Sequence, residues 1–435
     1  MTENVVGKSK EVSKGFESSK KVVLALQHLI AMFGATVLVP ILTGFDPAVA
    51  LICAGCGTLI FHFCTKKKVP VFLGSSFAFI GSIIMVKEQF GSLAYAQGGL
   101  IVAGLIYVLL SLVINKIGVD RLNKILPSHV IGPMIIVIGL SLLPVAIDMT
   151  GLSISSSAIA ISTPEIYLAI ITFSSAVLIN KFAKGFARQL SILIAVIIGY
   201  TVASLMGLVD MSAMTSAPLV AIPAFAAPKF DIGAILIIAP VVLAVFMEHI
   251  GDITTNGSVV GKNFIEDPGL NRTLLGDGLA TMFAGFIGGP ANTTYGENTG
   301  VLAITKNYDP SILRLAAIFA IVLGFVAKIG GLLRTIPVPV MGGISFMLFG
   351  MIAFIGVRIL KDNNVEYTTK NVIVMATIIV VGLGTTYLAK YFGISIGIPL
   401  SSSNPDLILT GLSLAALSGV ILNAILGLVY KIEKA

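Results

Sequence analysis

The chain has 435 residues, of which 56% are hydrophobic and 11% are charged. Soluble domains carry about a quarter of charged residues, so this composition excludes an ordinary soluble protein and predicts a polytopic membrane protein embedded in the lipid bilayer. The net charge of +7 raises the possibility of a nucleic-acid partner, which the distribution of the charges argues against.

Apolar runs near or above the roughly twenty residues needed to cross a bilayer as a helix recur along the whole chain. A polar tail at residues 1–20 precedes the first run without a small-residue cleavage site, so we expect a retained cytoplasmic tail. We expect about fourteen spans, at residues 21–43, 46–64, 69–86, 94–115, 126–147, 163–180, 189–208, 232–256, 273–288, 290–305, 311–333, 336–357, 371–389 and 408–430.

The basic residues indicate how these spans are oriented. If the N-terminus is cytoplasmic, all 28 lysines and arginines fall in the tails and loops of the cytoplasmic side except Lys87, Lys229, Lys328, Arg334 and Lys390. Cytoplasmic loops of membrane proteins carry an excess of Lys and Arg. The sequence therefore predicts a multi-pass protein of the cell (inner) membrane with both termini cytoplasmic, and it predicts no nucleic-acid partner.

Two segments depart from the pattern of long apolar helices. One is "VPVFLGSSFAFIGSIIMV", which begins at Val69 and contains Pro70 and Gly74; the other is "GPANTTYGENTG", which begins at Gly289 and contains Pro290. They are the third and the tenth of the predicted spans, and seven spans per half would place the second half upside down relative to the first. Matched interrupted segments in two inverted halves are typical of transporters that bind substrate between broken helices at mid-membrane.

A few acidic residues lie inside these spans. Glu248 and Asp252 are four residues apart, which places them on one helix face with His249 beside them, and Glu297 lies in the tenth span. Asp277 lies nearer the cytoplasmic end of its span. Because a charge inside the membrane is costly and no Lys or Arg lies within a neighbouring span, these acids are predicted to serve substrate or proton movement rather than a structural ion pair.

The same residues suggest the chemistry of the ligand. A carboxylate without a cationic partner can hold a proton near neutral pH, which would couple transport to a proton. Carboxylates offer acceptors, and half-helix starts around Phe77 and Gly296 offer N–H donors. Such a site fits a small neutral molecule with alternating N–H and C=O groups and repels an anion.

Enzyme chemistry is not indicated. Cys53, Cys56 and Cys64 lie in one apolar stretch and are interpreted as membrane-packed residues, as His62 and His129 are interpreted as structural. No Ser–His pair or metal-ligand set with credible spacing is apparent, so we expect no cofactor and no bound metal.

Five motifs together resemble the nucleobase/ascorbate transporter family, also called nucleobase–cation symporter 2, and among its members the bacterial uracil permeases most. They are "LQHLIAMFGATVLVPIL", "LGSSFAFI", "EHIGD", "NTTYGENTGVLAIT" and "IPVPVMGGIS". The resemblance implies an all-α polytopic fold of two inverted seven-span repeats with short extended strands in spans three and ten. It also implies a core domain at residues 21–116 and 231–333 and a gate domain at residues 117–230 and 334–435.

The resemblance further implies a proton-coupled uracil symporter working by alternating access. By motif, the side chains of Glu248 and Glu297 would bind the pyrimidine, as would the backbone at Phe77 and Gly296, and Phe77 and Tyr295 would line the pocket. Glu248, Asp252 and His28 are the candidates for proton coupling. Family members are often homodimers through the gate domain, which we carry over as an expectation.

Several alternatives stay open on the sequence. Glu297 opens the signature "ENTGVLAITK", where purine-transporting relatives usually have Gln, and this favours uracil over xanthine or uric acid. Position 252 is Asp, where some uracil permeases carry His, which leaves the proton relay and, in part, the pyrimidine assignment open. Sodium could replace the proton, whereas an anion transporter of the sulfate and bicarbonate type is opposed by two acids at the site.

Overall fold

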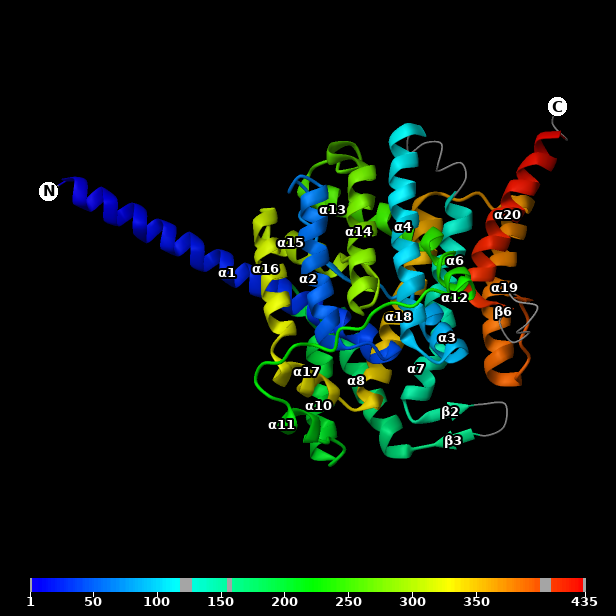
Figure 1. The fold of residues 1–435 in the computed structure, drawn as a ribbon, viewed down its shortest axis with the longest axis horizontal. Helices are drawn as coiled ribbons and strands as arrows, with labels where there is room; N and C mark the ends of the chain where they lie inside the picture. Colours follow the sequence, from blue (N-terminus) through cyan, green and yellow to red (C-terminus); the bar gives the residue numbers. More distant parts are fainter. Residues whose placement is uncertain (1, 118–126, 155–158, 400–407, 433–435) are drawn as a thin grey trace.

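The structure, a computed structural model, describes residues 2–117, 127–154, 159–399 and 408–432. Figure 1 shows a bundle of helices from which the N-terminal part of α1 projects. Three of the basic residues that the sequence places on the cytoplasmic side, Arg121, Lys124 and Lys434, lie outside the described residues.

The bundle is built almost entirely from α-helices. Those before residue 220 are α1 (Thr2–Thr43), α2 (Pro47–Cys64), α3 (Ile80–Phe90), α4 (Leu93–Ile117), α6 (Ser128–Ser141), α7 (Leu143–Met149), α8 (Thr163–Phe182), α9 (Phe186–Gln189), α10 (Ser191–Leu205) and α11 (Ser212–Ser216). Those after it are α12 (Ile232–Ile238), α13 (Val241–Val260), a π-helical turn (Ile265–Gly269), α14 (Leu270–Ile287), α15 (Gly296–Thr305), α16 (Pro310–Gly324), α17 (Ala327–Arg334), α18 (Val338–Asp362), α19 (Thr369–Phe392) and α20 (Gly411–Ile432).

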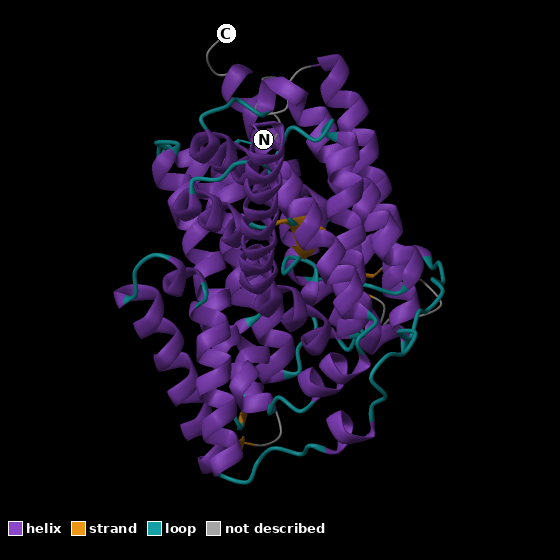
Figure 2. Cartoon of the chain, turned by 90° about the vertical axis from the view of Figure 1, so that its left-hand side faces the viewer, coloured by secondary structure: helices purple, strands orange, loops and turns teal. Residues whose placement is uncertain are grey.

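Short strands form three antiparallel pairs. They are β1 (Leu73–Ser75) with β4 (Asn292–Thr294), β2 (Leu152–Ile154) with β3 (Ile159–Ile161), and β5 (Ile398–Pro399) with β6 (Ile408–Leu409). Every residue of β1 and β4 is buried, and Figure 2 shows strands enclosed by helices in the middle of the bundle. The strands β1 and β4 occupy the two segments whose Pro and Gly residues predict an interrupted helix.

Each of the fourteen predicted segments contains a helix. Within the described residues, nine helical stretches are long and apolar enough to cross a bilayer, or ten if α16 and α17, which meet at a bend of 78°, form one broken span. The remaining predicted segments hold α3, α10, α14 and α15, which fall short in length or apolar content. The structure is thus an all-α polytopic membrane protein with nine to ten candidate spans, and the count of fourteen stays a prediction.

Local sequence explains where several helices begin. Asp46 caps α2 by accepting a hydrogen bond from the Ala48 amide at 2.8 Å, and Pro47 occupies the first helical position. Asp231 caps α12 through the Gly233 amide at 2.7 Å in the same way. An Asp side chain satisfies amides that have no partner within the helix, and proline fits where no amide is needed.

The helices pack in two groups. In one group α14 contacts α2 and α4, and α16 contacts α1 and α2; in the other, α18 contacts α6 and α8, and α19 contacts α6 and α20. Small residues permit close approach between membrane helices: a Cβ atom on Gly104 of α4 would lie 2.6 Å from the carbonyl oxygen of Gly278 on α14. The first group contains both broken segments, and the second faces them across the candidate site.

Candidate functional site

The pairing of β1 with β4 brings the two broken segments together. Gly74 lies opposite Thr293, and the Tyr295 amide donates to the Phe72 carbonyl at 3.0 Å. The Tyr295 hydroxyl donates to the Ser75 carbonyl at 2.9 Å. Backbone inside a membrane protein must find partners within the protein, and here each interrupted segment supplies them to the other.

Neighbouring helices form hydrogen bonds with backbone and side-chain groups of β1 and β4 that have no partner within the strand pair. The Asn292 side chain donates to the carbonyls of Cys53 on α2 and Ala280 on α14, at 3.1 and 3.2 Å. The Thr58 hydroxyl of α2 accepts from the Leu73 amide at 2.9 Å. The strand pair is therefore anchored to α2 and α14 rather than being a flexible loop.

The strand pair requires glycine at its centre. A Cβ atom on Gly74 would lie 2.3 Å from both Cε2 and Cζ of the Tyr295 ring and 2.7 Å from the Thr36 hydroxyl. No side chain fits at such distances without a shift of its neighbours. Gly74 thus allows the Tyr295 ring to pack directly against β1 at the edge of the site.

After each strand the chain starts a short helix directed away from the pair. Phe77 lies in the turn between β1 and α3, and Gly296 is the first residue of α15. The first amides of a helix have no intrahelical partner and carry a partial positive charge. A Cβ atom on Gly296 would meet nothing within 4 Å, so the start of α15 faces open space.

That open space is a cavity of about 300 Å³. Six of the seven residues proposed from the sequence for substrate binding or proton coupling line it: Phe77, Glu248, Asp252, Tyr295, Gly296 and Glu297. The four-residue spacing of the two acids on α13 does place both side chains on the cavity face. The seventh residue, His28, is buried on α1, and the Asn298 side chain donates to its carbonyl at 3.0 Å; it does not line the cavity.

The acids in the cavity have different partners. The Thr294 hydroxyl donates to a carboxylate oxygen of Asp252 at 2.8 Å. Among the described residues, neither Glu248 nor Glu297 takes part in a salt bridge. These two carboxylates are therefore the acceptors with the most capacity left for a ligand.

His249 does not lie on the cavity-facing side of α13 that Glu248 and Asp252 share. It is fully buried and its ring bonds Asp277 at 2.8 Å and Thr273 at 2.9 Å, both on α14. Asp277 is thus buried against α13 and lies apart from the cavity lining. The polar stripe expected on α13 is divided between a cavity face and a face that packs on α14.

The other histidines and the cysteines have structural surroundings. His62 bonds the Val71 carbonyl at 2.9 Å, and His129 bonds the Asn423 side chain at 2.9 Å. The three cysteines are free, with Cys53 and Cys64 buried and Cys56 half-buried. Among the described residues, no group of three or more His, Cys, Asp or Glu is arranged to hold a metal ion.

Sequence reasoning missed the opposite wall of the cavity. This wall comes from the second group of helices and comprises Asn180, Arg188, Gln189, Ser191, Ile192, Leu348, Met351, Ile352 and Ile355. Arg188 is exposed and belongs to α9, a short helix in a basic loop, so a basic side chain lines the cavity although the prediction concerned only basic residues within neighbouring spans. Gln189 also lies close to Gly300, since a Cβ atom added to Gly300 would lie 2.4 Å from the Gln189 amide oxygen. This contact joins residues far apart in the chain, and no local sequence pattern predicts it.

Comparison with known proteins identifies the family. Residues 19–391 match the model described as "Permease family". The chain is 41% identical to the uracil permease of Bacillus caldolyticus over 93% of this chain and 91% of that protein. It is 42% identical to the uracil permease of Bacillus subtilis (strain 168) over 92% of this chain and 91% of that protein.

Among solved structures, the fold is similar to that of the transmembrane domain of a cyanobacterial bicarbonate transporter, BicA, with a TM-score of 0.63 and 16% identity over 85% of this chain and 96% of that chain. At that identity the likeness concerns the fold alone. The matched residues and the permease relatives together show that the chain belongs to the nucleobase–cation symporter 2 family of permeases and is a membrane transporter rather than an enzyme.

Proposed function

We propose that the protein is a proton-coupled uracil symporter that takes up uracil by alternating access. The observation that carries the proposal is a cavity of about 300 Å³ in which two carboxylates face the starts of two half-helices and form no salt bridge with any residue that the structure describes. The uracil permeases to which the chain is about two-fifths identical support the choice of substrate. Uracil is small, neutral and flat, with alternating N–H and C=O groups that match these acceptors and donors.

In this proposal Glu248 and Glu297 accept hydrogen bonds from the N–H groups of the base. The amides at Phe77 and Gly296 donate to its carbonyl oxygens, and the rings of Phe77 and Tyr295 bound the pocket. Carboxylate acceptors with partly desolvated surroundings form stronger hydrogen bonds than neutral groups.

Proton coupling is assigned to the acids of the same cavity. Glu248 and Asp252 lie on one face of α13, and protonation of either would reduce the negative charge that faces the base. His28 acts indirectly, through Asn298, which directly follows Glu297. We expect uracil uptake to rise at acidic external pH and to collapse with a protonophore, and a sodium requirement without pH dependence would contradict the coupling.

The domain organisation follows the same reasoning. We propose fourteen spans in two inverted repeats, with a core domain at residues 21–116 and 231–333 and a gate domain at residues 117–230 and 334–435. The two packing groups support this division, because the acidic cavity lies between α13 and α15 on one side and α18 on the other. Both termini are placed in the cytoplasm by the charge distribution.

The decisive test of the pocket is Glu297→Gln, with Glu366→Gln as the matched control on an exposed loop. A hydrogen bond to a charged group contributes about 1.5–3 kcal/mol, so the KM for uracil uptake should rise by roughly ten-fold to a hundred-fold. Glu366→Gln should behave like the wild type. Unchanged uptake by Glu297→Gln would show that the pocket assignment is wrong.

The substrate is tested by thermal stability of the purified protein with a panel of nucleobases. A ligand that binds the native state stabilises it by mass action. Uracil should raise the apparent melting temperature of the wild type, and less so that of Glu297→Gln. Stabilisation by xanthine without stabilisation by uracil would reverse the choice of substrate.

A further inference from the structure

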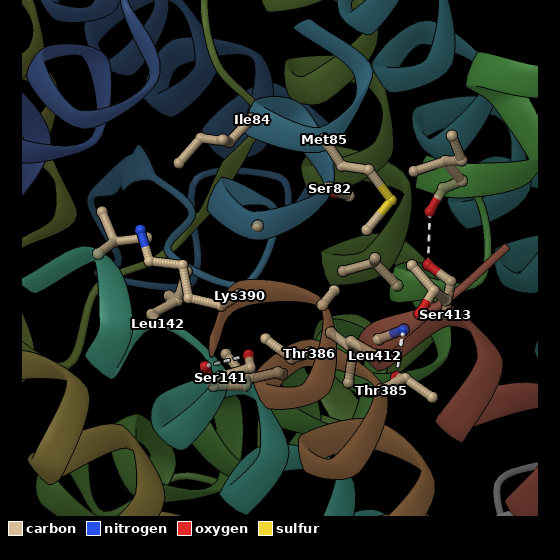
Figure 3. Close-up of a pocket in the computed structure, with 18 of the residues that line it drawn as sticks. Ser82, Ile84, Met85, Ser141, Leu142, Thr385, Thr386, Lys390, Leu412 and Ser413 are labelled. Atoms are coloured by element: carbon tan, nitrogen blue, oxygen red, sulfur yellow. Dashed lines mark hydrogen bonds between the residues drawn. The ribbon is translucent and has the colours of Figure 1, made fainter. Parts of the chain in front are cut away.

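A second cavity, of about 420 Å³, lies next to the acidic one. Phe77 lines the acidic cavity and the next residue, Ala78, lines this one, so the turn between β1 and α3 borders both. Figure 3 shows side chains of α3, α6, α19 and α20 around it. Under the proposed topology this cavity is on the extracellular side, because its rim includes Glu88 and Lys390.

The walls of this cavity carry hydroxyl groups whose protons are already engaged. Ser82, Ser141 and Thr386 each donate to a backbone carbonyl about one turn earlier in the chain, at 2.9, 3.2 and 2.8 Å respectively. A hydroxyl that donates its proton keeps two lone pairs as acceptors. These hydroxyl groups therefore offer hydrogen-bond acceptors within a lining that is otherwise largely apolar.

The charged groups at the rim add to this character. Lys390 also lines the cavity, and its positive charge is balanced by the ion pair with Asp148. Glu88 is exposed and forms no salt bridge within the described part of the chain. A carboxylate and several hydroxyl oxygens oppose an anion and favour a molecule that brings N–H donors.

The cavity is also bounded by both packing groups. The Ser413 hydroxyl of α20 donates to the Ile237 carbonyl of α12, and so joins the two groups beside the cavity. At 420 Å³ against 300 Å³, it is large enough for any solute that the acidic cavity holds. A solute here would contact α3, and the turn that leads into α3 carries Phe77 of the acidic cavity.

We propose that this cavity is an outer recognition site, which binds a small neutral solute with N–H donors, such as a pyrimidine base, before the acidic cavity receives it. The inference rests on the proposed function and adds a second site to it. It predicts that uracil binds the outer site with unchanged affinity when its binding in the acidic cavity is weakened.

The test uses Thr386→Cys and a membrane-impermeant methanethiosulfonate applied to the outside of intact cells. The wild type gives the background, since its cysteines all lie in α2. Thr386→Cys should be labelled from outside, and uracil should slow the labelling, halving its rate at a concentration equal to the Kd of the site. Ile394→Cys, on an exposed residue after α19 that lines neither cavity, should be labelled at a rate that uracil does not change.

The deciding measurement repeats this in Thr386→Cys/Glu297→Gln. The uracil concentration that halves the labelling rate should be unchanged there, because the outer site does not use Glu297, whereas binding in the acidic cavity weakens by roughly ten-fold to a hundred-fold. A half-protecting concentration that rises with this weakening would show that uracil acts only through the acidic cavity, and absence of labelling from outside would place the cavity on the wrong face; either result overturns the proposal. If Thr386→Cys does not reach the membrane, Ser141→Cys on α6, which also lines the cavity, takes its place. Failure of the proposed function appears separately, as wild-type protein that neither takes up uracil nor is stabilised by it.

Discussion

Replacing Gly74 with alanine is expected to distort the acidic cavity through the Tyr295 ring. The new methyl group would lie 2.3 Å from two ring atoms and 2.7 Å from the Thr36 hydroxyl. The backbone at Gly74 cannot easily move, because it is the central residue of β1 and pairs with Thr293. The ring must therefore leave its place and give up the 2.9 Å hydrogen bond to the Ser75 carbonyl.

The size of the effect follows from these two losses. Forcing an extra methyl group into a packed site costs about 1–3 kcal/mol, and the lost hydrogen bond adds about 0.5–1.5 kcal/mol. If this free energy opposes the binding-competent geometry, affinity for uracil falls by at least roughly ten-fold. The apparent melting temperature should fall as well, because the same contacts hold β1 to β4.

The assay is uracil uptake together with thermal unfolding of the purified protein, with Gly384→Ala as the matched control. A Cβ atom on Gly384 in α19 would meet nothing within 4 Å, and alanine is favoured over glycine inside a helix. The control should keep wild-type uptake and stability. If Gly74→Ala also transports and unfolds like the wild type, the argument that Tyr295 requires glycine at this position is refuted.

Three further predictions concern single side chains. Thr294→Val removes the hydroxyl that donates to Asp252 and should lower uptake about ten-fold or more. The control Thr254→Val, at an exposed position of α13 that does not line the cavity, should leave uptake and stability intact, and equal effects of the two would contradict this. Asn298→Ala removes the side-chain donor that bonds the buried His28 carbonyl and should destabilise the protein by about 0.5–1.5 kcal/mol, seen as a lower melting temperature. Partial burial acts to raise the pKa of Asp309, but hydrogen bonds from Ser311 hold that pKa below its usual value. The stability that Asp309 contributes is therefore present above about pH 4 and is lost as the pH falls through the lowered pKa. Asp309→Ala should cost about 1 kcal/mol of folding stability at neutral pH and progressively less in acid, and a pH-independent cost would refute the capping role.

The sequence predicts the broken segments because their signal is local. Pro70, Gly74 and Pro290 interrupt apolar runs, and the structure has strands at these two places. The pairing of the two strands joins segments far apart in the chain, and nothing in the sequence near Gly74 indicates that Thr293 will lie opposite it. The resemblance to a known family supplied the expectation of strands, but not their register or their anchoring by Asn292.

The acidic face of the site was also accessible from the sequence. Glu248 and Asp252 are separated by about one helical turn. Because a charge inside a membrane span costs free energy, its presence indicates a functional role. Residues such as Met351 and Ile352 carry no such signal, because an apolar residue in a membrane helix is ordinary wherever it faces. Arg188 is an ordinary cytoplasmic loop residue by sequence, and only the packing of α9 brings it to the cavity.

The hydrogen bonds between β1 and β4 have a consequence for how the site responds to change. Residues that lie 220 positions apart, such as Ser75 and Tyr295, are held together by direct bonds, so the two half-helices behave as one mechanical element. Substitutions on the two sides of the pocket should then show coupling energies and not simple sums, as contacting residues do. A double-mutant cycle across the strand pair would measure the coupling free energy between the two distant segments of the chain.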